Sequence, residues 1–164
     1  MNIALLCGGP SRERGISLNS ARSFLDHTKP LAIQLFLFYL HPSHLFYELL
    51  PADLYSNTPA DFDFKLASCK KGLTEEQFLE RLKGIDLVYP LIHGRYGEDG
   101  SLQKLFEKHA IPFAGSSSES CKRMFNKHLA HKWLEKEGFS TLPALLLPSD
   151  EEAIGSFWKK HHLK

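Results

Sequence analysis

Cysteines are scarce in this sequence, and the three present, Cys7, Cys69 and Cys121, form no C-x-x-C pair. An odd number at scattered positions is not a disulfide framework, so the sequence predicts a chain from a reducing compartment, the cytosol. An excess of one charge is also lacking, since 20 Lys and Arg residues stand against 19 Asp and Glu residues. No large field of one sign therefore exists to recruit nucleic acid or an anionic membrane.

Long hydrophobic runs are missing as well. The longest apolar stretch, 31–40, is interrupted by Gln34 and is far shorter than the ~20 residues that a membrane helix needs. The first residues, 1–7, have neither the basic start nor the apolar length of a signal peptide. We therefore expect neither a membrane span nor secretion.

The composition is that of a folded globular domain. The chain has 164 residues, of which 43% are hydrophobic, 12% aromatic and 24% charged. These fractions exclude global disorder, and the length is sufficient for a substantial core.

Apolar runs typical of strands alternate with stretches of helical spacing. Strands are expected at 3–7, 31–40, 86–92 (a central strand, although Pro90 cannot donate to a ladder), 111–114 and 142–147. Helices are expected from Ser17 to Pro30, from a Thr74–Gln77 capping box to about Lys83, over 102–106, from Ser118 or Ser120 to Glu137 before Gly138, and from Ser149 or Asp150 onward. The order predicts an α/β domain with a mostly parallel sheet.

The segment 41–83 is the hardest to interpret, because prolines and a glycine interrupt it. Within it, Phe62, Phe64 and Leu66 alternate with polar residues. Such alternation is typical of a half-exposed strand, which we expect here.

Three polar, glycine-rich loops follow predicted strands, at Gly8-Gly9, His93-Gly94 and Gly115-Ser116. In open parallel sheets, ligands bind outside the carboxyl ends of the strands. The sequence therefore predicts that these loops converge on one edge of the sheet and form a binding site.

The first loop has the pattern of a strand, a glycine turn and a helix start. It is neither G-x-G-x-x-G nor a P-loop, which argues against dinucleotide or Walker-type binding. Its backbone N–H groups suit an anion, and Glu13 suits an ammonium group. The alternative is a solvated turn in which Glu13 pairs with Arg12 or Arg14.

The second loop, 93–100, places three glycines near His93, Arg95, Glu98 and Asp99. The glycines let a backbone approach a ligand closely, while a lone histidine is more often structural than functional, so both interpretations stay open. Farther along, His128 and His131 share a helical face, but without an H-E-x-x-H pattern or a thiol pair we predict no metal site.

Together these segments resemble the N-terminal part of D-alanine–D-alanine ligases. The resemblance is carried by Gly8-Gly9-x-Ser11-x-Glu13-Arg14-x-Ile16-Ser17-Leu18-x-Ser20, by Leu91-x-His93-Gly94-Arg95-x-Gly97-Glu98-Asp99-Gly100-x-Leu102-Gln103, and by Ile111-Pro112-Phe113-x-Gly115-Ser116, Asn126-Lys127 and Glu137-Gly138-Phe139. It covers most of the chain except about 41–80. This chain differs from the usual family pattern at two positions. The family usually has an acidic residue where this chain has Gly15, and an aspartate where it has Asn126.

The resemblance implies a Rossmann-like, parallel-sheet pre-ATP-grasp domain at 1–117 and the beginning of an ATP-grasp central domain at 118–164. The family is a carbon–nitrogen ligase that joins two D-alanines for peptidoglycan, using ATP to form an acyl phosphate, with Mg²⁺ (or Mn²⁺) on the nucleotide. A cytoplasmic enzyme that forms a homodimer is implied, without nucleic-acid or membrane partners.

The resemblance also assigns roles to residues. Glu13 corresponds to the carboxylate that binds the ammonium of the first D-alanine, and His93 to a histidine that orients this substrate. Lys127 corresponds to a lysine that contacts the ATP phosphates. The remaining residues expected to line the first D-alanine subsite are Gly8, Gly9, Ser11 and Gly94.

The family's later ATP-grasp segments, including its metal ligands, have no counterpart in these 164 residues. Phosphoryl transfer needs those charges, so we expect a fragment that releases no ADP on its own. Two alternatives stay open. One is a truncated, non-catalytic binding or assembly module, and the other is a related D-Ala–D-lactate or D-Ala–D-Ser ligase.

Overall fold

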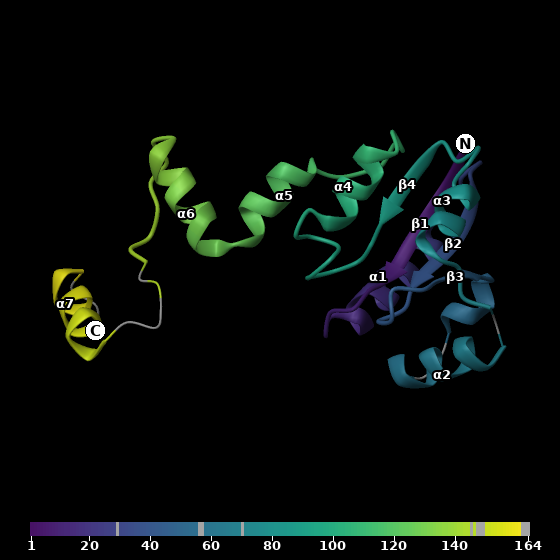
Figure 1. Cartoon of the computed structure of the whole chain (residues 1–164), viewed down its shortest axis with the longest axis horizontal. Helices are drawn as coiled ribbons and strands as arrows, with labels where there is room; N and C mark the ends of the chain where they lie inside the picture. The colour runs from purple at the N-terminus through teal and green to yellow at the C-terminus, as the bar shows by residue number, and fades with distance from the viewer. Residues whose placement is uncertain (29, 56–57, 70, 145, 147–149, 162–164) are drawn as a thin grey trace. The chain divides into compact units, whose positions relative to one another are not determined.

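The computed structural model describes residues 1–28, 30–55, 58–69, 71–144, 146 and 150–161. The chain divides into two compact units, Met1–Lys122 and Arg123–Lys164 (Figure 1). The family resemblance predicts a functional boundary after residue 117, and that boundary stays a prediction.

A four-stranded sheet organises the first unit. Its strands are β1 (Asn2–Gly8), β2 (Gln34–Leu40), β3 (Phe46–Leu49) and β4 (Leu87–Pro90), in the order β3-β2-β1-β4. β1 pairs in parallel with β2 and β4, and β3 pairs antiparallel with β2. The predicted α/β class with a mostly parallel sheet is confirmed, and β3 is a strand that the apolar pattern does not reveal.

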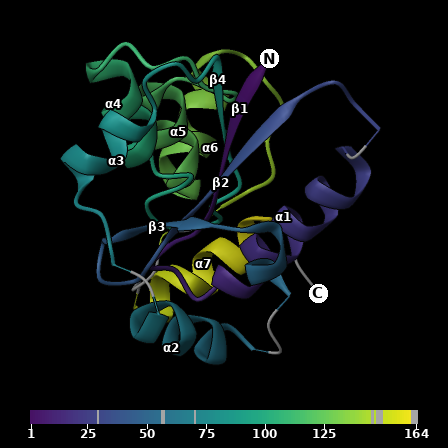
Figure 2. The same cartoon turned by 90° about the vertical axis from the view of Figure 1, so that its right-hand side faces the viewer.

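Helices cover both faces of this sheet. α1 (Arg14–Thr28) and α2 (Pro59–Cys69) lie on one side, together with the 3-10 helix η1 (Pro51–Leu54), and α3 (Glu75–Arg81) and α4 (Ser101–Lys108) lie on the other (Figure 2). Each face carries its own buried cluster because successive residues of a strand point to opposite faces. Leu5, Leu37 and Tyr39 face α1 and α2, and Leu6 and Phe38 face α3 and α4.

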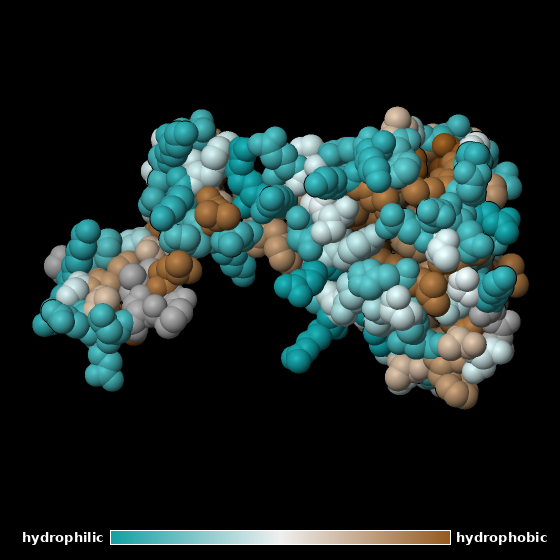
Figure 3. All heavy atoms as spheres, viewed as in Figure 1, coloured by the Kyte–Doolittle hydropathy of each residue, from teal (hydrophilic) through white to brown (hydrophobic). Residues whose placement is uncertain are grey.

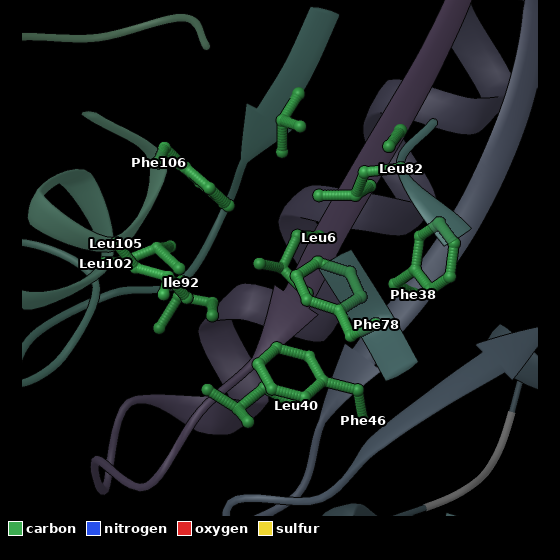
Figure 4. Packing of buried hydrophobic residues seen from close by; sticks show 12 residues of the cluster. Leu6, Phe38, Leu40, Phe46, Phe78, Leu82, Ile92, Leu102, Leu105 and Phe106 are labelled. Carbon is green, nitrogen blue, oxygen red and sulfur yellow. The ribbon is translucent and has the colours of Figure 1, made fainter. Parts of the chain in front are cut away.

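Aromatic rings fill the cluster on the second face. Phe78 of α3 stacks on Phe46 with ring centroids 4.1 Å apart and meets the edge of Phe38 at 5.2 Å (Figure 4). Phe78 and Phe46 are almost fully buried. The segment that is hardest to interpret from sequence therefore supplies central core residues.

The strand expected at residues 62–66 is wrong, because these residues lie in α2. Phe62 and Leu66 stand four residues apart on the buried face of the helix, and Phe64 is 72% exposed. So short an alternation of apolar and polar residues fits both the repeat of a strand and the repeat of a helix, so it does not distinguish between the two. Pro59 at the start of the helix and the Thr58 hydroxyl, which accepts a hydrogen bond from the Asp61 N–H, favour the helix.

The strand predicted at 86–92 forms as β4, but the prediction of a central position is wrong. β4 ends the sheet order, and its outer side has a single parallel bridge between Val88 and Phe113. That bridge is the part of the strand expected at 111–114 that forms. The N–H of Val88 points to this outer side. The backbone nitrogen two residues later, that of Pro90, faces the same side, so the N–H that proline lacks would have pointed where no ladder continues.

From residue 118 onward, across the boundary after Lys122 and through the second unit, the helices are short. The single helix predicted from residue 118 to 137 is wrong, because α5 (Ser118–Phe125) and α6 (Lys127–Lys136) are separated at Asn126, whose side chain caps α6 by accepting hydrogen bonds from the N–H groups of His128 and Leu129. α7 (Glu151–Lys160) begins after Asp150, which caps it as predicted. Residues 142–144 form no strand, and positions 145, 147 and 149 lie outside the described residues.

None of the described residues of α5, α6 and α7 is buried. Large apolar side chains on these helices are exposed (Figure 3); they are Met124, Phe125, Leu129, Ile154 and Trp158. No helix in the described ranges is long and apolar enough to cross a membrane.

The capping box predicted at Thr74 is confirmed, and we expect it to stabilise the first unit. The Thr74 hydroxyl accepts from the Gln77 N–H at 3.3 Å, and the Gln77 side chain accepts from the Thr74 N–H at 3.0 Å. Thr74→Ala should lower the free energy of unfolding by about 1 kcal/mol, measured by urea denaturation. Thr74→Ser, which keeps the hydroxyl, is the control, and an equal loss in both variants would contradict a role for the cap.

Candidate functional site

The first predicted loop joins β1 to α1 and is fastened to that helix. The N–H of Gly8 donates to the buried hydroxyl of Ser17 at 2.8 Å, and the N–H of Glu13 donates to the hydroxyl of Ser11 at 3.0 Å. Ser17 belongs to the first turns of α1, so the loop and the helix start move as one piece. The backbone around Glu13 is therefore held in place by hydrogen bonds on both sides.

The second predicted loop, after β4, meets the first loop directly. The hydroxyl of Ser11 donates to the carbonyl of His93 at 2.8 Å. Gly94 has a φ of +71°, and a Cβ at this position would lie 2.8 Å from Oε2 of Glu13 and 3.0 Å from Oγ of Ser11. A side chain at position 94 would thus be strained and would collide with the Glu13 carboxylate, which explains why glycine stands there.

The imidazole of His93 is held by two partners. Its Nε2 lies 3.2 Å from the hydroxyl of Ser20 on α1, and its Nδ1 lies 3.7 Å from Oε1 of Glu98. The other oxygen of Glu98 accepts from the N–H of Gly94 at 2.9 Å. With 34% of its side chain exposed, His93 is held in place but remains accessible to solvent.

The side chain of Asp99 stabilises the backbone of the same loop. Its carboxylate accepts from the N–H groups of Tyr96 and Ser101 at 3.0 and 2.9 Å. Partial burial alone would raise the pKa of Asp99, but these hydrogen bonds and the nearby Arg95 charge hold that pKa below its ordinary value. The carboxylate therefore serves the loop backbone.

The solvated-turn alternative for the first loop predicts that Arg12 or Arg14 neutralises Glu13. Instead, the guanidinium of Arg14 pairs with Asp63 of α2, with 2.8 Å between Nη2 and Oδ2. Glu13 is exposed, and within the part of the chain that the structure describes its carboxylate has no hydrogen bond or ion pair. The Glu13 carboxylate thus carries an uncompensated negative charge beside Gly94.

The structure brings together five of the predicted subsite residues and the two loops that hold them. These residues are Gly9, Ser11, Glu13, His93 and Gly94. Gly9 is included because a Cβ at this position would lie 2.5 Å from the side chain of Ile92. Gly8 ends β1 behind them. The third loop lies at the same edge through the parallel bridge of Phe113 to Val88, but a Cβ at Gly115 would meet only the Phe113 ring.

Three residues of this site are not identified by the sequence reasoning. Ser20 stands in the quoted motif, one helical turn after Ser17, and this spacing is the signal that places it beside the loop. Glu98 contacts His93, although its sequence position indicates only a charge in a loop. Asp63 lies in α2, where the apolar pattern predicts a strand, so no signal in the sequence points to it.

Lys127 lies in the second unit, as the exposed first residue of α6. Its position at a capped helix start is chemically suited to a phosphate oxygen. Among the described residues, no group of three or more His, Cys, Asp or Glu side chains is arranged to hold a metal ion.

A separate pocket of about 640 Å³ contains none of the predicted residues. It lies over the start of β2 and the end of β3, with Phe36, Leu50 and Leu73 in its apolar wall and Glu48 and Lys71 as its charged residues. The loop site described above is therefore distinct from this pocket.

Comparisons with known proteins agree with the motifs. The family model described as D-ala D-ala ligase N-terminus matches residues 2–116. The D-alanine–D-alanine ligase of Tolumonas auensis is 32% identical over 154 residues, which are 93% of this chain and 42% of that protein. The vancomycin C-type resistance protein VanC1 of Enterococcus gallinarum is 30% identical over 167 residues, 97% of this chain and 48% of that protein.

The fold agrees as well. The crystal structure of the D-alanine–D-alanine ligase from Helicobacter pylori superposes with a TM-score of 0.75 at 28% identity, over 96% of this chain and 50% of that one. The chain thus spans about half the length of the proteins it matches. Motifs, family model and fold agree that this chain belongs to the D-alanine–D-alanine ligase family and carries its N-terminal part.

Proposed function

We propose that this chain forms the subsite for the first D-alanine in an ATP-dependent D-alanine–D-alanine ligase. The observation that carries the proposal is the unpaired Glu13 carboxylate, held against Gly94 and beside His93 at the carboxyl edge of the sheet. A carboxylate without a cation of its own attracts an ammonium group, and open parallel sheets bind ligands at this edge.

The neighbouring groups suit the rest of an amino acid. Ser11 and Gly94 lie next to the Glu13 carboxylate without large side chains, and Gly8 and Gly9 begin the loop that carries Glu13. His93, fixed by Ser20 and Glu98, orients the bound substrate. Holding the first D-alanine in one orientation presents its carboxylate for phosphorylation, which lowers the entropic cost of the reaction.

The remaining parts of the activity follow from family membership and belong to the same proposal. Lys127 would contact the phosphates of ATP, which would supply the phosphoryl group for the carboxylate of the first D-alanine and leave as ADP. Mg²⁺ (or Mn²⁺) would accompany the nucleotide, and among the described residues no group of three or more His, Cys, Asp or Glu side chains is arranged to hold it. The complete ligase acts on free D-alanine in the cytoplasm, as a homodimer, and its dipeptide enters peptidoglycan synthesis.

A D-Ala–D-Ser or D-Ala–D-lactate ligase is the second candidate, and the crystal structure of the VanG D-Ala:D-Ser ligase from Enterococcus faecalis has the same fold over 98% of this chain. Both candidate enzymes bind D-alanine as their first substrate, so Glu13 and His93 would have the same roles in each. They differ in the second substrate.

The subsite is tested by Glu13→Gln, which keeps the size of the side chain and removes its charge. A charge-assisted hydrogen bond contributes roughly 1.5–3 kcal/mol, so the Kd of the chain for D-alanine should rise about tenfold or more. NMR titration with D-alanine, following the Gly94 amide, measures this Kd. Glu76→Gln, an exposed acid in the first turn of α3, is the matched control and should leave the Kd unchanged.

Equal affinity of Glu13→Gln and the unaltered chain would show that the first loop is a solvated turn. His93→Ala should weaken the same ligand through lost orientation, while the N–H of Gly94 keeps its partner Glu98.

A further inference from the structure

Both oxygens of the Asp63 carboxylate are engaged at the start of α1. One oxygen lies 2.8 Å from Nη2 of Arg14, and the other accepts a hydrogen bond from the hydroxyl of Tyr39. The side chains of Arg14 and Asp63 are only 22% and 17% exposed. A partly buried ion pair is screened less by salt than a surface pair, and the second hydrogen bond fixes its geometry.

Tyr39 ties this ion pair to the sheet. It belongs to β2, and its ring meets the edge of Phe62 of α2 with centroids 4.7 Å apart. Burial, followed by the hydrogen bond to Asp63, raises the pKa of Tyr39 above its ordinary value, so the phenol stays protonated and remains a donor at any physiological pH.

The Arg14 side chain is held in this place by Asp63. Its Nε is buried and has no hydrogen-bond partner, so the side chain is held through its terminal nitrogen by Asp63. Glu13, the preceding residue, points to the other side, where its carboxylate faces Gly94. The two consecutive, oppositely charged side chains thus point to different places, Arg14 to Asp63 of α2 and Glu13 to Gly94.

The local charge depends on Asp63. Without Asp63, the Arg14 guanidinium would lose its carboxylate partner, and its uncompensated positive charge next to Glu13 would oppose an incoming ammonium group. With Asp63 present, Arg14 is paired, and the Glu13 carboxylate faces Gly94 without a cation partner among the described residues. Opposite charge favours and like charge disfavours a bound cation by the same Coulomb energy.

We propose that Asp63 is a positioning residue of the first amino-acid subsite: it captures Arg14 and so leaves the charge of Glu13 available for the substrate ammonium. The proposal rests on the proposed function of Glu13 and adds to it a residue of α2, a helix outside the family motifs. Asp63 itself contacts no substrate in this arrangement.

The test compares Asp63→Asn with Tyr39→Phe in the whole chain. Asp63→Asn keeps the shape and the acceptor for Tyr39 but removes the charge, so the Kd for D-alanine should rise about fivefold at low salt. Tyr39→Phe removes the hydrogen bond but keeps the ion pair, so the Kd should change by less than about twofold. Asp63→Glu, which restores the charge, should recover most of the affinity.

Salt distinguishes charge from packing. The Debye length falls from about 30 Å at 0.01 M to about 3 Å at 1 M salt, so the difference between Asp63→Asn and the unaltered chain should shrink at high salt. A difference that persists at high salt, or an equal loss in Tyr39→Phe, would show that Asp63 acts through packing and would overturn the proposal.

A measurement without ligand completes the design. In Asp63→Asn, NMR should show the Arg14 guanidinium leaving α2 and pairing with Glu13, and an Arg14 that stays in place would overturn the proposal. If Glu13→Gln weakens D-alanine binding and Asp63→Asn does not, only this inference fails. If neither variant affects binding, the proposed function of Glu13 fails with it.

Discussion

Phe78→Ala is expected to produce the largest loss of stability of any single change considered for this chain. Phe78 is fully buried, stacks on Phe46 and meets the edge of Phe38. Truncating a buried phenylalanine costs about 3–5 kcal/mol, through lost transfer energy and the cavity left behind. Domains are stable by only about 5–15 kcal/mol, so a large share of the total is at stake.

Urea denaturation followed by far-UV circular dichroism measures this loss. Phe64→Ala is the matched control, because Phe64 is also a helical phenylalanine but is 72% exposed, and it should change the free energy of unfolding by less than about 0.5 kcal/mol. A loss below about 1 kcal/mol in Phe78→Ala would show that α3 does not pack on the sheet as described.

The parts of the fold that sequence predicts well have a local cause. β1 and the Thr74 cap are determined by nearby residues, namely an apolar run closed by glycines and a hydroxyl three residues before a glutamine. The α/β class follows from the alternation of such segments, and the parallel pairing of β1 with β2 and β4 bears it out.

Two of the errors arise where tertiary contacts determine the secondary structure, and a third arises from a local helix cap. The face of α2 that carries Phe62 and Leu66 is buried by packing on the sheet, which no window of sequence contains. β3 forms because Phe46 and Leu49 pair with β2 across a turn, although the run is only four residues long. At Asn126 the side chain caps a new helix, and this local hydrogen bond overrides the continuous helical spacing.

The same division applies to the candidate site. Glu13, Ser11 and His93 are expected in the candidate site because the family resemblance assigns them to it and because glycine-rich loops after parallel strands converge on one edge. Asp63 is not, since it reaches Arg14 from a helix whose position depends on packing. The charge that Glu13 presents is therefore a property of the folded chain and not of its own motif.

Gly97 tests how strictly the loop of His93 is shaped by its backbone. A Cβ at Gly97 would lie 2.1 Å from the carbonyl oxygen of Ile92, a distance that real Cβ atoms do not reach, so the backbone must move. The carbonyl of Gly97 also accepts a buried hydrogen bond of 2.6 Å from Gln103 of α4, which opposes any such movement. Gly97→Ala should therefore cost about 3 kcal/mol of stability and displace His93, the next residue after Ile92.

Gly84→Ala separates the effect on the loop from the effect on stability. Gly84 has a φ of +82°, but a Cβ there would meet nothing within 4 Å, so the cost is the left-handed conformation alone, about 1–2 kcal/mol. At a temperature where both variants are folded, only Gly97→Ala should lose affinity for D-alanine in the NMR titration. Equal affinity of the two variants would mean that the Ile92–Gly97 contact supports the fold without positioning His93, and the orienting role proposed for that histidine would then lose its structural basis.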